Sequence, residues 1–155
     1  MNLTRVEVMV PISGTGLLAV EDIEDIRLRA YAIMRDLERY PAYMPSVNSI
    51  DILERKDNEM TTRWDAEIDG APICWVQTVL TLDESQEMFF EATEGDFDVF
   101  KGKWSVIESG GQVCLELLVE YRLGIPVIED VLGPILKEKV KANSEAMLDA
   151  IVLQL

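Results

Sequence analysis

The last thirty residues, 126–155, constrain the fold most, because they predict one long amphipathic helix. Pro126 suits the first helical turn, where a missing N–H costs nothing, and Gly133-Pro134 predicts a break or kink near Gly133. A helix of about twenty residues spans roughly 30 Å, so its apolar face must be buried along a partner of similar length. That face has steps of four, three, four and four residues, and it carries Leu136, Val140, Asn143, Met147 and Ile151.

The residues before this helix predict one further helix and a series of strands. Residues 3–12 alternate between apolar and polar side chains and predict a first strand. Residues 21–38 predict an amphipathic helix that ends at Tyr40-Pro41, and Pro45 leaves room for only a short helical turn after it. The period then changes to two, and six more strands are predicted at 47–55, 59–69, 71–82, 86–93, 97–107 and 113–123.

Two turn signals indicate that these strands are antiparallel. Asp69-Gly70 and Ser109-Gly110-Gly111 are typical of short β-hairpin loops. Six consecutive strands with short connections form an antiparallel meander, and one face of such a sheet must be covered. Only the C-terminal helix is long enough to cover it. We therefore expect an α+β fold in a single domain, 1–155, in which a curved seven-stranded antiparallel sheet grips the long helix.

The charge of the chain limits its partners. It has 29 acidic and 14 basic residues, and its formal net charge is −15. Because this charge repels phosphate backbones, we expect no nucleic-acid partner. No run approaches eighteen apolar residues and no signal peptide is recognisable, so we expect no membrane span and a cytoplasmic location.

The absence of histidine removes several kinds of active site. A Ser-His or Cys-His dyad and an imidazole-ligated zinc site are impossible, and two cysteines cannot form a four-cysteine zinc site. We expect neither a metal nor a cofactor. We interpret Cys74 and Cys114, which lie in apolar runs, as buried small side chains in a reducing compartment and not as a disulfide.

Three short motifs carry a resemblance to a known family. Residues 36–45, Asp-Leu-Glu-Arg-Tyr-Pro-Ala-Tyr-Met-Pro, resemble the turn after the first helix of the START-like superfamily, also called SRPBCC or helix-grip proteins. Glu94-Gly95-Asp96-Phe97 followed by Gly102-Lys103-Trp104 resembles a hairpin of its polyketide cyclase and coenzyme Q-binding branch, with Asp96 where proline is usual. Gly133-Pro134 also fits. The resemblance covers residues 30–151, whereas residues 13–29 depart from it. We expect Asp36 to cap or brace its turn.

The resemblance implies a cavity between sheet and helix that holds a hydrophobic or aromatic molecule. The tryptophans lie on three predicted strands and Tyr121 on a fourth, which predicts either an aromatic ligand lining or ordinary core packing. Gln77 shares a strand face with Trp75 and would hydrogen-bond a ligand carbonyl, unless it faces water at a sheet edge. Asn143 either reaches the cavity or marks a boundary. The candidate ligand-binding residues are Tyr43, Trp64, Trp75, Gln77, Phe90, Phe100, Trp104, Leu117, Tyr121, Asn143 and Met147.

Arg63, Glu67 and Gln77 are the candidate catalytic residues. Arg63 and Glu67 share one face of the strand 59–69, where either would move a proton or stabilise an enolate if that face lines the cavity. Glu91 and Glu94 allow the same reading, and for these four charged side chains a solvated face is the alternative. The opposite face of 59–69 suits the interior better, since it carries Trp64, Ala66 and Ile68.

The polyketide aromatase/cyclases provide a residue-by-residue comparison. The resemblance implies two functional positions that this sequence does not keep: Val79 stands where they carry an arginine, and Val47 falls near a tyrosine of theirs. Trp75 is kept. The resemblance therefore carries over the ligand-binding wall and not the arginine chemistry.

Two functional hypotheses follow, and whether the protein is an enzyme stays open between them. In the first, the protein folds a poly-β-ketone or related aromatic precursor, free or tethered to a carrier protein, for aldol cyclisation and dehydration. In the second, it is a non-catalytic carrier of a quinone or lipid. A third hypothesis, a ribosome-associated protein, conflicts with the charge of −15. Either leading hypothesis is compatible with a monomer or a homodimer.

Overall fold

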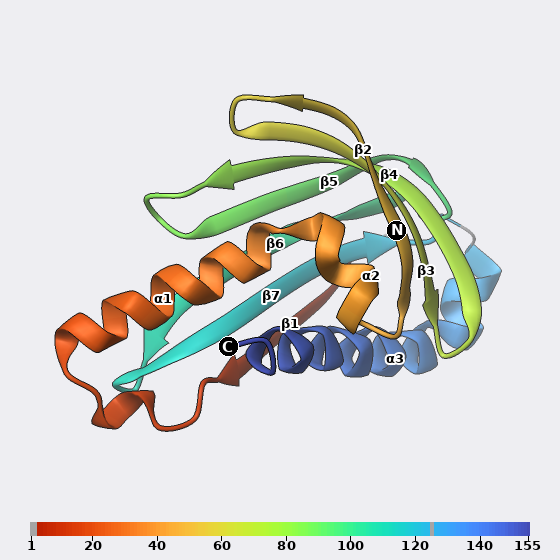
Figure 1. The fold of residues 1–155 in the computed structure, drawn as a ribbon. Helices are drawn as coiled ribbons and strands as arrows, with labels where there is room; N and C mark the ends of the chain where they lie inside the picture. Colours follow the sequence, from red (N-terminus) through yellow and green to blue (C-terminus); the bar gives the residue numbers. More distant parts are fainter. Residues whose placement is uncertain (1–2, 125) are drawn as a thin grey trace.

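One antiparallel sheet and one long helix dominate the fold (Figure 1). A computed structural model describes residues 3–124 and 126–155, with side chains for all of these except 126–129. The sheet has seven strands in the order β1-β7-β6-β5-β4-β3-β2, and every neighbouring pair is antiparallel. This confirms the predicted α+β architecture. The elements are β1 (Thr4–Pro11), η1 (Thr15–Leu17), α1 (Val20–Arg35), η2 (Leu37–Arg39), α2 (Tyr40–Tyr43), β2 (Val47–Lys56), β3 (Glu59–Ile68), β4 (Ala71–Leu82), β5 (Glu87–Gly95), β6 (Val99–Ser109), β7 (Gln112–Arg122) and α3 (Pro126–Val152).

The hairpin turns set the register of the sheet. Asp69 and Gly70 join β3 to β4 with φ angles of 53° and 83°, and Gly110 and Gly111 join β6 to β7 with φ angles of 60° and 79°. Two consecutive left-handed residues give the turn whose twist matches that of the flanking strands. Both predicted hairpins are therefore confirmed, and with them the alternation that sends tryptophans to one face of the sheet.

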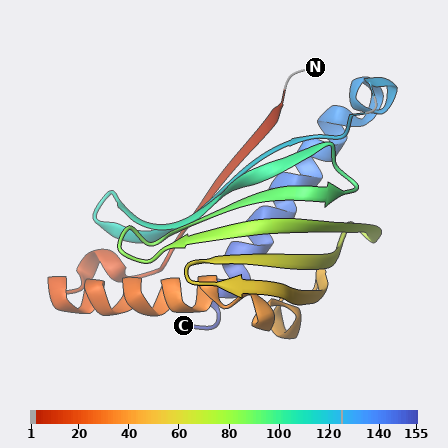
Figure 2. The same cartoon turned by 90° about the horizontal axis from the view of Figure 1, so that it is seen from above.

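Helix α3 crosses the strands on the inner side of the sheet, as Figure 2 shows. Val140, Met147 and Ile151 are buried, which confirms most of the predicted stripe, and Leu148 is fully buried beside them. Of the two outcomes predicted near Gly133, a break or a kink, the break is wrong, because α3 is one helix with Pro134 inside it. A proline deprives the carbonyl four residues earlier of its donor. That carbonyl belongs to the exposed residue Asp130, where water can replace the donor.

Helix α1 ends earlier than predicted, at Arg35. Leu37 and Tyr40 are buried to 2% and 0% exposure, and the η2 turn between them redirects the chain so that both side chains enter the core. Tyr40 also donates a hydrogen bond from its hydroxyl to the carbonyl of Met34. We predicted that Asp36 caps or braces its turn, and it makes no side-chain capping hydrogen bond, so a side-chain cap is wrong. Its backbone carbonyl accepts from Arg39 N–H instead, at 3.2 Å.

The two cysteines are free thiols in different environments. Cys114 is buried, as predicted, but Cys74 is exposed. Cys74 alternates with Trp75 along β4, so it lies on the outer face while the indole lies on the inner one. Reading an apolar run as buried throughout ignored this alternation.

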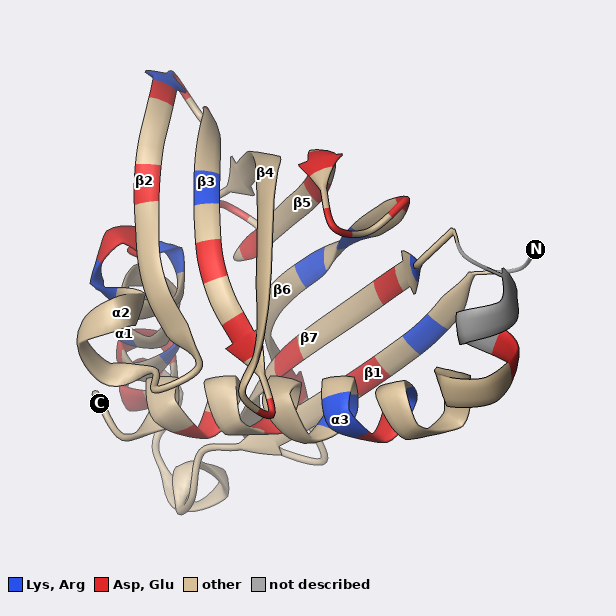
Figure 3. Ribbon diagram, turned by 90° about the vertical axis from the view of Figure 1, so that its right-hand side faces the viewer, with Lys and Arg blue, Asp and Glu red and all other residues tan. Residues whose placement is uncertain are grey.

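The outer surface carries the acidity of the chain. In Figure 3 acidic residues occur on β2, β3, β7 and α3, and basic residues interrupt them. Within the described part of the chain, no helix is long and apolar enough to cross a membrane.

Candidate ligand-binding cavity

The inner face of the sheet carries a continuous group of aromatic rings. Trp64 on β3 stacks on Trp75 on β4, with ring centroids 5.2 Å apart and an interplanar angle of 18°. Phe100 on β6 continues the group at 5.0 Å from Trp75, and Phe97 stacks on Phe100 at 5.1 Å. Strand alternation places Trp64, Trp75 and Phe100 on one face, and Trp64 and Trp75 are direct cross-strand partners. Phe97 joins them from the turn between β5 and β6. The result is an aromatic wall made of two stacked pairs, with Phe100 tilted by 59° to Trp75 where the pairs meet.

A cavity lies between this wall and α3. Its volume is about 60 Å³. All of the predicted ligand-binding residues line it except Tyr43 and Tyr121. Those two pack into the aromatic core instead, Tyr43 edge-on against Tyr40 at 6.0 Å and Tyr121 against Phe97 at 5.6 Å. The lining consists of Ser46, Val47, Trp64, Ala66, Glu67, Ile68, Ile73, Trp75, Gln77, Phe90, Phe97, Phe100, Trp104, Leu117, Val119, Val140, Asn143, Ser144 and Met147.

Gln77 presents an amide to the cavity in a fixed orientation. Its side chain is 3% exposed, so the alternative that it faces water at a sheet edge is wrong. The indole N–H of Trp75 donates to Gln77 Oε1 at 2.8 Å. This bond engages the amide oxygen, and the Gln77 amide nitrogen makes no hydrogen bond within the described part of the chain. Gln77 therefore offers the cavity a hydrogen-bond donor.

The other indole donor is already engaged. Trp64 Nε1–H donates to Thr62 Oγ1 at 3.0 Å, and Thr62 is fully buried. Burying an indole N–H without a partner is costly, so each of these two tryptophans is matched by a polar residue two positions along its own strand face. In β4 that partner is Gln77, which lines the cavity, and in β3 it is Thr62, which does not.

Helix α3 contributes two further polar side chains. Asn143 is half-buried in the lining, and its amide nitrogen lies 3.7 Å from the sulfur of Met147. Ser144 is 3% exposed and also lines the cavity. The sequence interpretation missed Ser144 because it searched for apolar residues. Its spacing of four from both Val140 and Leu148 would have placed it on the buried face.

The charged candidates occupy other places. Arg63 is exposed, and its register partners Asp51 and Val76 flank it on the outer face of the sheet, so it does not reach the cavity. The condition on which Arg63 was a catalytic candidate, that its strand face lines the cavity, is therefore not met. Glu91 and Glu94 are exposed as well. Glu67 shares that strand face with Arg63, but it is half-buried at the end of β3 and is the one charged residue among the described lining residues.

The two positions taken from aromatase/cyclases provide no polar group. Val79 is 2% exposed and belongs to the hydrophobic core, outside the cavity lining. Val47 lines the cavity and is apolar. The described lining thus contains no cation, and an anionic head group would find no counter-charge there. Among the described residues, no group of three or more His, Cys, Asp and Glu side chains could hold a metal ion.

Burial holds the tyrosines beside the cavity in their neutral form. It is the main cause that raises the pKa of Tyr43 to about 12, and the charge of Asp36 contributes in the same direction. Burial also raises the pKa of Tyr40 well above its usual value. These two phenols, neither of which lines the cavity, therefore stay protonated to a higher pH than exposed tyrosines do.

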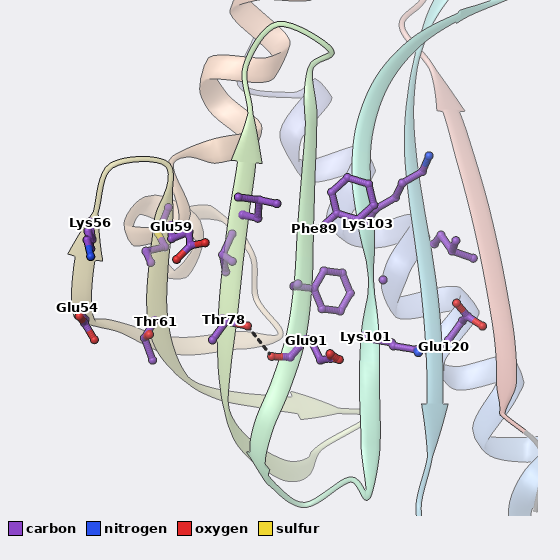
Figure 4. A pocket seen from close by; sticks show the side chains of 16 residues that line it. Glu54, Lys56, Glu59, Thr61, Thr78, Phe89, Glu91, Lys101, Lys103 and Glu120 are labelled. Atoms are coloured by element: carbon purple, nitrogen blue, oxygen red, sulfur yellow. Dashed lines mark hydrogen bonds between the residues drawn. The ribbon is translucent and has the colours of Figure 1, made fainter.

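A larger hollow of about 630 Å³ lies on the opposite, outer face of strands β2–β7 (Figure 4). Charges of opposite sign alternate across it, since Lys101 pairs in register with Glu91 on β5 and Glu120 on β7. Lys103 forms an ion pair with Glu87 at 3.1 Å. This mixed pattern is typical of a solvated sheet face and selects no ligand of one charge. We assign no function to the hollow.

Comparison with known proteins gives a consistent picture. The family described as "polyketide cyclase / dehydrase and lipid transport" matches residues 28–148. A protein of Thermus thermophilus has a similar structure, with a TM-score of 0.81 and 24% identity over 96% of this chain and 94% of that one. The Zhui aromatase/cyclase of Streptomyces sp. R1128 gives a TM-score of 0.80 at 16% identity, over 98% of this chain and 93% of that one. A START superfamily protein of Mycobacterium smegmatis gives 0.73 at 20% identity, over 97% and 95%. No curated protein sequence matches the chain.

Proposed function

Because the chain belongs to the polyketide cyclase/dehydrase and lipid transport family, we propose that it binds an uncharged, planar molecule bearing carbonyl groups in the cavity beneath α3. The observation that carries the proposal is the Trp64–Trp75 stack with the Gln77 amide held at its edge. The stack offers a planar apolar surface, and the amide nitrogen offers a donor to a carbonyl oxygen. The lack of a cation in the described lining argues against a fatty-acid carboxylate.

The leading form of this proposal is a protein that shapes a poly-β-ketone for aldol cyclisation. Holding one carbonyl carbon close to an enolisable carbon of the same chain supplies part of the rate gain. The Gln77 N–H then stabilises the carbonyl oxygen that gains negative charge as the carbon–carbon bond forms. Glu67 at the rim of the cavity is the candidate acceptor for the proton that the enolisable carbon loses.

The second form is a carrier that binds a quinone and performs no chemistry. It is favoured by one observation, that the described lining contains a single carboxylate and that this carboxylate lies at the rim. A quinone presents two carbonyl oxygens on a flat ring and needs only the aromatic wall and the Gln77 donor. The two forms of the proposal use the same binding site and differ only in whether the bound ligand undergoes a chemical reaction.

The cavity must open before either ligand can bind. Pockets for small molecules measure about 300–1,000 Å³, whereas the cavity measures about 60 Å³. Ring rotation in the wall or displacement of α3 must supply the remaining space. The aromatic side chains that now fill the interior therefore both recognise the ligand and close the empty site.

The first experiment is native mass spectrometry of the protein purified from its own host, followed by extraction of any bound molecule. A bound quinone supports the carrier, and a bound aromatic polyketide or its precursor supports the cyclase. A protein that stays ligand-free and also fails to bind menadione, a small neutral naphthoquinone, at millimolar concentration would contradict the proposal. Binding is followed by quenching of tryptophan fluorescence, since all three tryptophans line the cavity.

A further inference from the structure

The degree of burial marks where the cavity meets the surface. Most of the wall, including Trp64, Trp75 and Gln77, is buried. The half-buried lining residues gather where β2 begins, around the β3–β4 hairpin, at the start of β6 and on α3: Ser46, Glu67, Ile68, Ile73, Phe100 and Asn143. This end of the cavity is its mouth.

One ion pair spans the mouth. The ammonium of Lys139 on α3 donates to the carboxylate of Asp69 at the tip of the β3–β4 hairpin. Each partner is next in sequence to a lining residue, Asp69 to Ile68 and Lys139 to Val140. Figures 1 and 3 show from two sides that the hairpin reaches down to α3. Separating this pair would move the two edges of the mouth apart.

The ion pair between Lys139 and Asp69 is weak because it is exposed to solvent. The two side chains are 41% and 68% exposed, so water and salt compete for both charges. The hydrogen bond from Lys139 lowers the pKa of the Asp69 carboxyl, which agrees with contact between the two charges. Exposed ion pairs contribute little to global stability. A weak contact at the half-buried end of the described cavity suits a closure that opens and shuts.

We propose that Lys139 and Asp69 form an electrostatic latch on the mouth and that ligands enter between the β3–β4 hairpin and α3. The role of the latch in ligand entry rests on the proposed ligand-binding function. The opening of the hairpin itself does not, because it is measurable without a ligand. The latch sets how often the mouth opens. Loss of the latch raises the entry and exit rates of a ligand together and leaves its affinity nearly unchanged.

Hydrogen exchange at the hairpin tests the latch directly. The amide of Glu67 donates to the carbonyl of Ser46 at 2.8 Å, so its exchange reports separation of the hairpin from the start of β2. In Asp69→Asn and in Lys139→Gln, exchange of residues 66–75 is expected to accelerate about two- to five-fold, the range that an exposed ion pair can supply. Wild-type exchange should accelerate similarly at 1 M salt, where the screening length is about 3 Å.

A matched control separates the latch from a general effect of lost charge. Arg35 and Asp83 form an ion pair at 2.8 Å with similar exposures of 40% and 59%, away from the mouth. Asp83→Asn should leave exchange at 66–75 unchanged. The charge-swapped double variant Asp69→Lys/Lys139→Asp should restore slow exchange, which a merely local effect of either substitution would not do.

Ligand kinetics complete the test. Stopped-flow quenching by menadione should show entry and exit rates that both rise about two- to five-fold in Asp69→Asn. Hairpin exchange that is equal in wild type, Asp69→Asn and Lys139→Gln would overturn the latch, whatever the ligand data show. Faster exchange together with no menadione binding by any variant would instead sustain the latch and count against the proposed function.

Discussion

Replacing Gln77 tests the central contact of the site in two independent ways. In Gln77→Leu the indole N–H of Trp75 loses the acceptor that lies 2.8 Å away. Trp75 is 8% exposed, so little water can replace that acceptor. Leaving a buried donor unsatisfied costs about 1–3 kcal/mol. The free energy of unfolding should therefore fall by about that amount, measured by urea denaturation with circular dichroism.

A double-mutant cycle isolates the hydrogen bond from the change in packing. Trp75→Phe alone frees the Gln77 oxygen, and Gln77→Leu/Trp75→Phe removes both partners, so the double variant should lose less stability than the two single losses together. Thr78→Val, on the exposed outer face of the same strand, should change little. Equal stability of Gln77→Leu and wild type would refute the hydrogen bond and the orientation of the amide. Menadione affinity should fall up to about tenfold in Gln77→Leu, which corresponds to one lost neutral hydrogen bond.

Three further predictions concern the framework around the cavity. A Cβ on Gly102 would lie 1.8 Å from the carbonyl oxygen of Leu118, so Gly102→Ala should prevent folding or lower the thermal midpoint severely. A Cβ on Gly133 would meet nothing within 4 Å, so the control Gly133→Ala should raise the thermal midpoint slightly. Leu148 on α3 is fully buried, and Leu148→Ala should cost about 2–5 kcal/mol in urea denaturation. The pKa of Tyr43 is raised by burial to about 12, above the value of about 10 in an unfolded chain, so its contribution to stability is complete below pH 10 and is lost as pH rises toward 12. The difference in absorbance at 295 nm between wild type and Tyr43→Phe should show this late titration, and a midpoint near 10 would contradict the burial of its hydroxyl.

Most of the fold was predictable because periodicity alone specifies it. The alternation in β4 and β7 indicated the inner face, and the 3.6-residue stripe of α3 indicated what covers it. The alternation in β3 left its inner face open until the structure placed Trp64 and Ala66 inside. The errors share a cause, which is that local signals were given more weight than three-dimensional context. Pro134 did not break α3, because the turn before it is exposed, and Cys74 followed the alternation of its strand instead of the apolar character of its neighbours.

The candidate site was predictable in its apolar part and less so in its polar part. A tryptophan on an inner strand face must meet the cavity or the core, so Trp64, Trp75 and Trp104 could be named from the sequence. Whether a polar residue faces inward depends on twist and on partners that no local pattern specifies. The Trp75–Gln77 bond is such a case, because periodicity puts both residues on one face without showing that the indole N–H donates to the amide oxygen. Ser144 is different, since its spacing of four from Val140 and Leu148 already indicates burial.

The small volume of the closed cavity makes ligand affinity a difference between two packings. Closed, the interior gains the contacts of the Trp64–Trp75 and Phe97–Phe100 stacks. When the cavity opens, the rings lose some of these stacking contacts. A planar ligand replaces the lost contacts by stacking on the same rings, so it recovers the free energy that opening costs. A flexible acyl chain of equal apolar area fills the space without stacking and also loses more conformational freedom on binding. For matched neutral ligands of equal surface area, the protein should therefore bind the fused aromatic ring more tightly than the alkane, and equal affinities would show that area alone, and not the shape of the aromatic wall, governs this site.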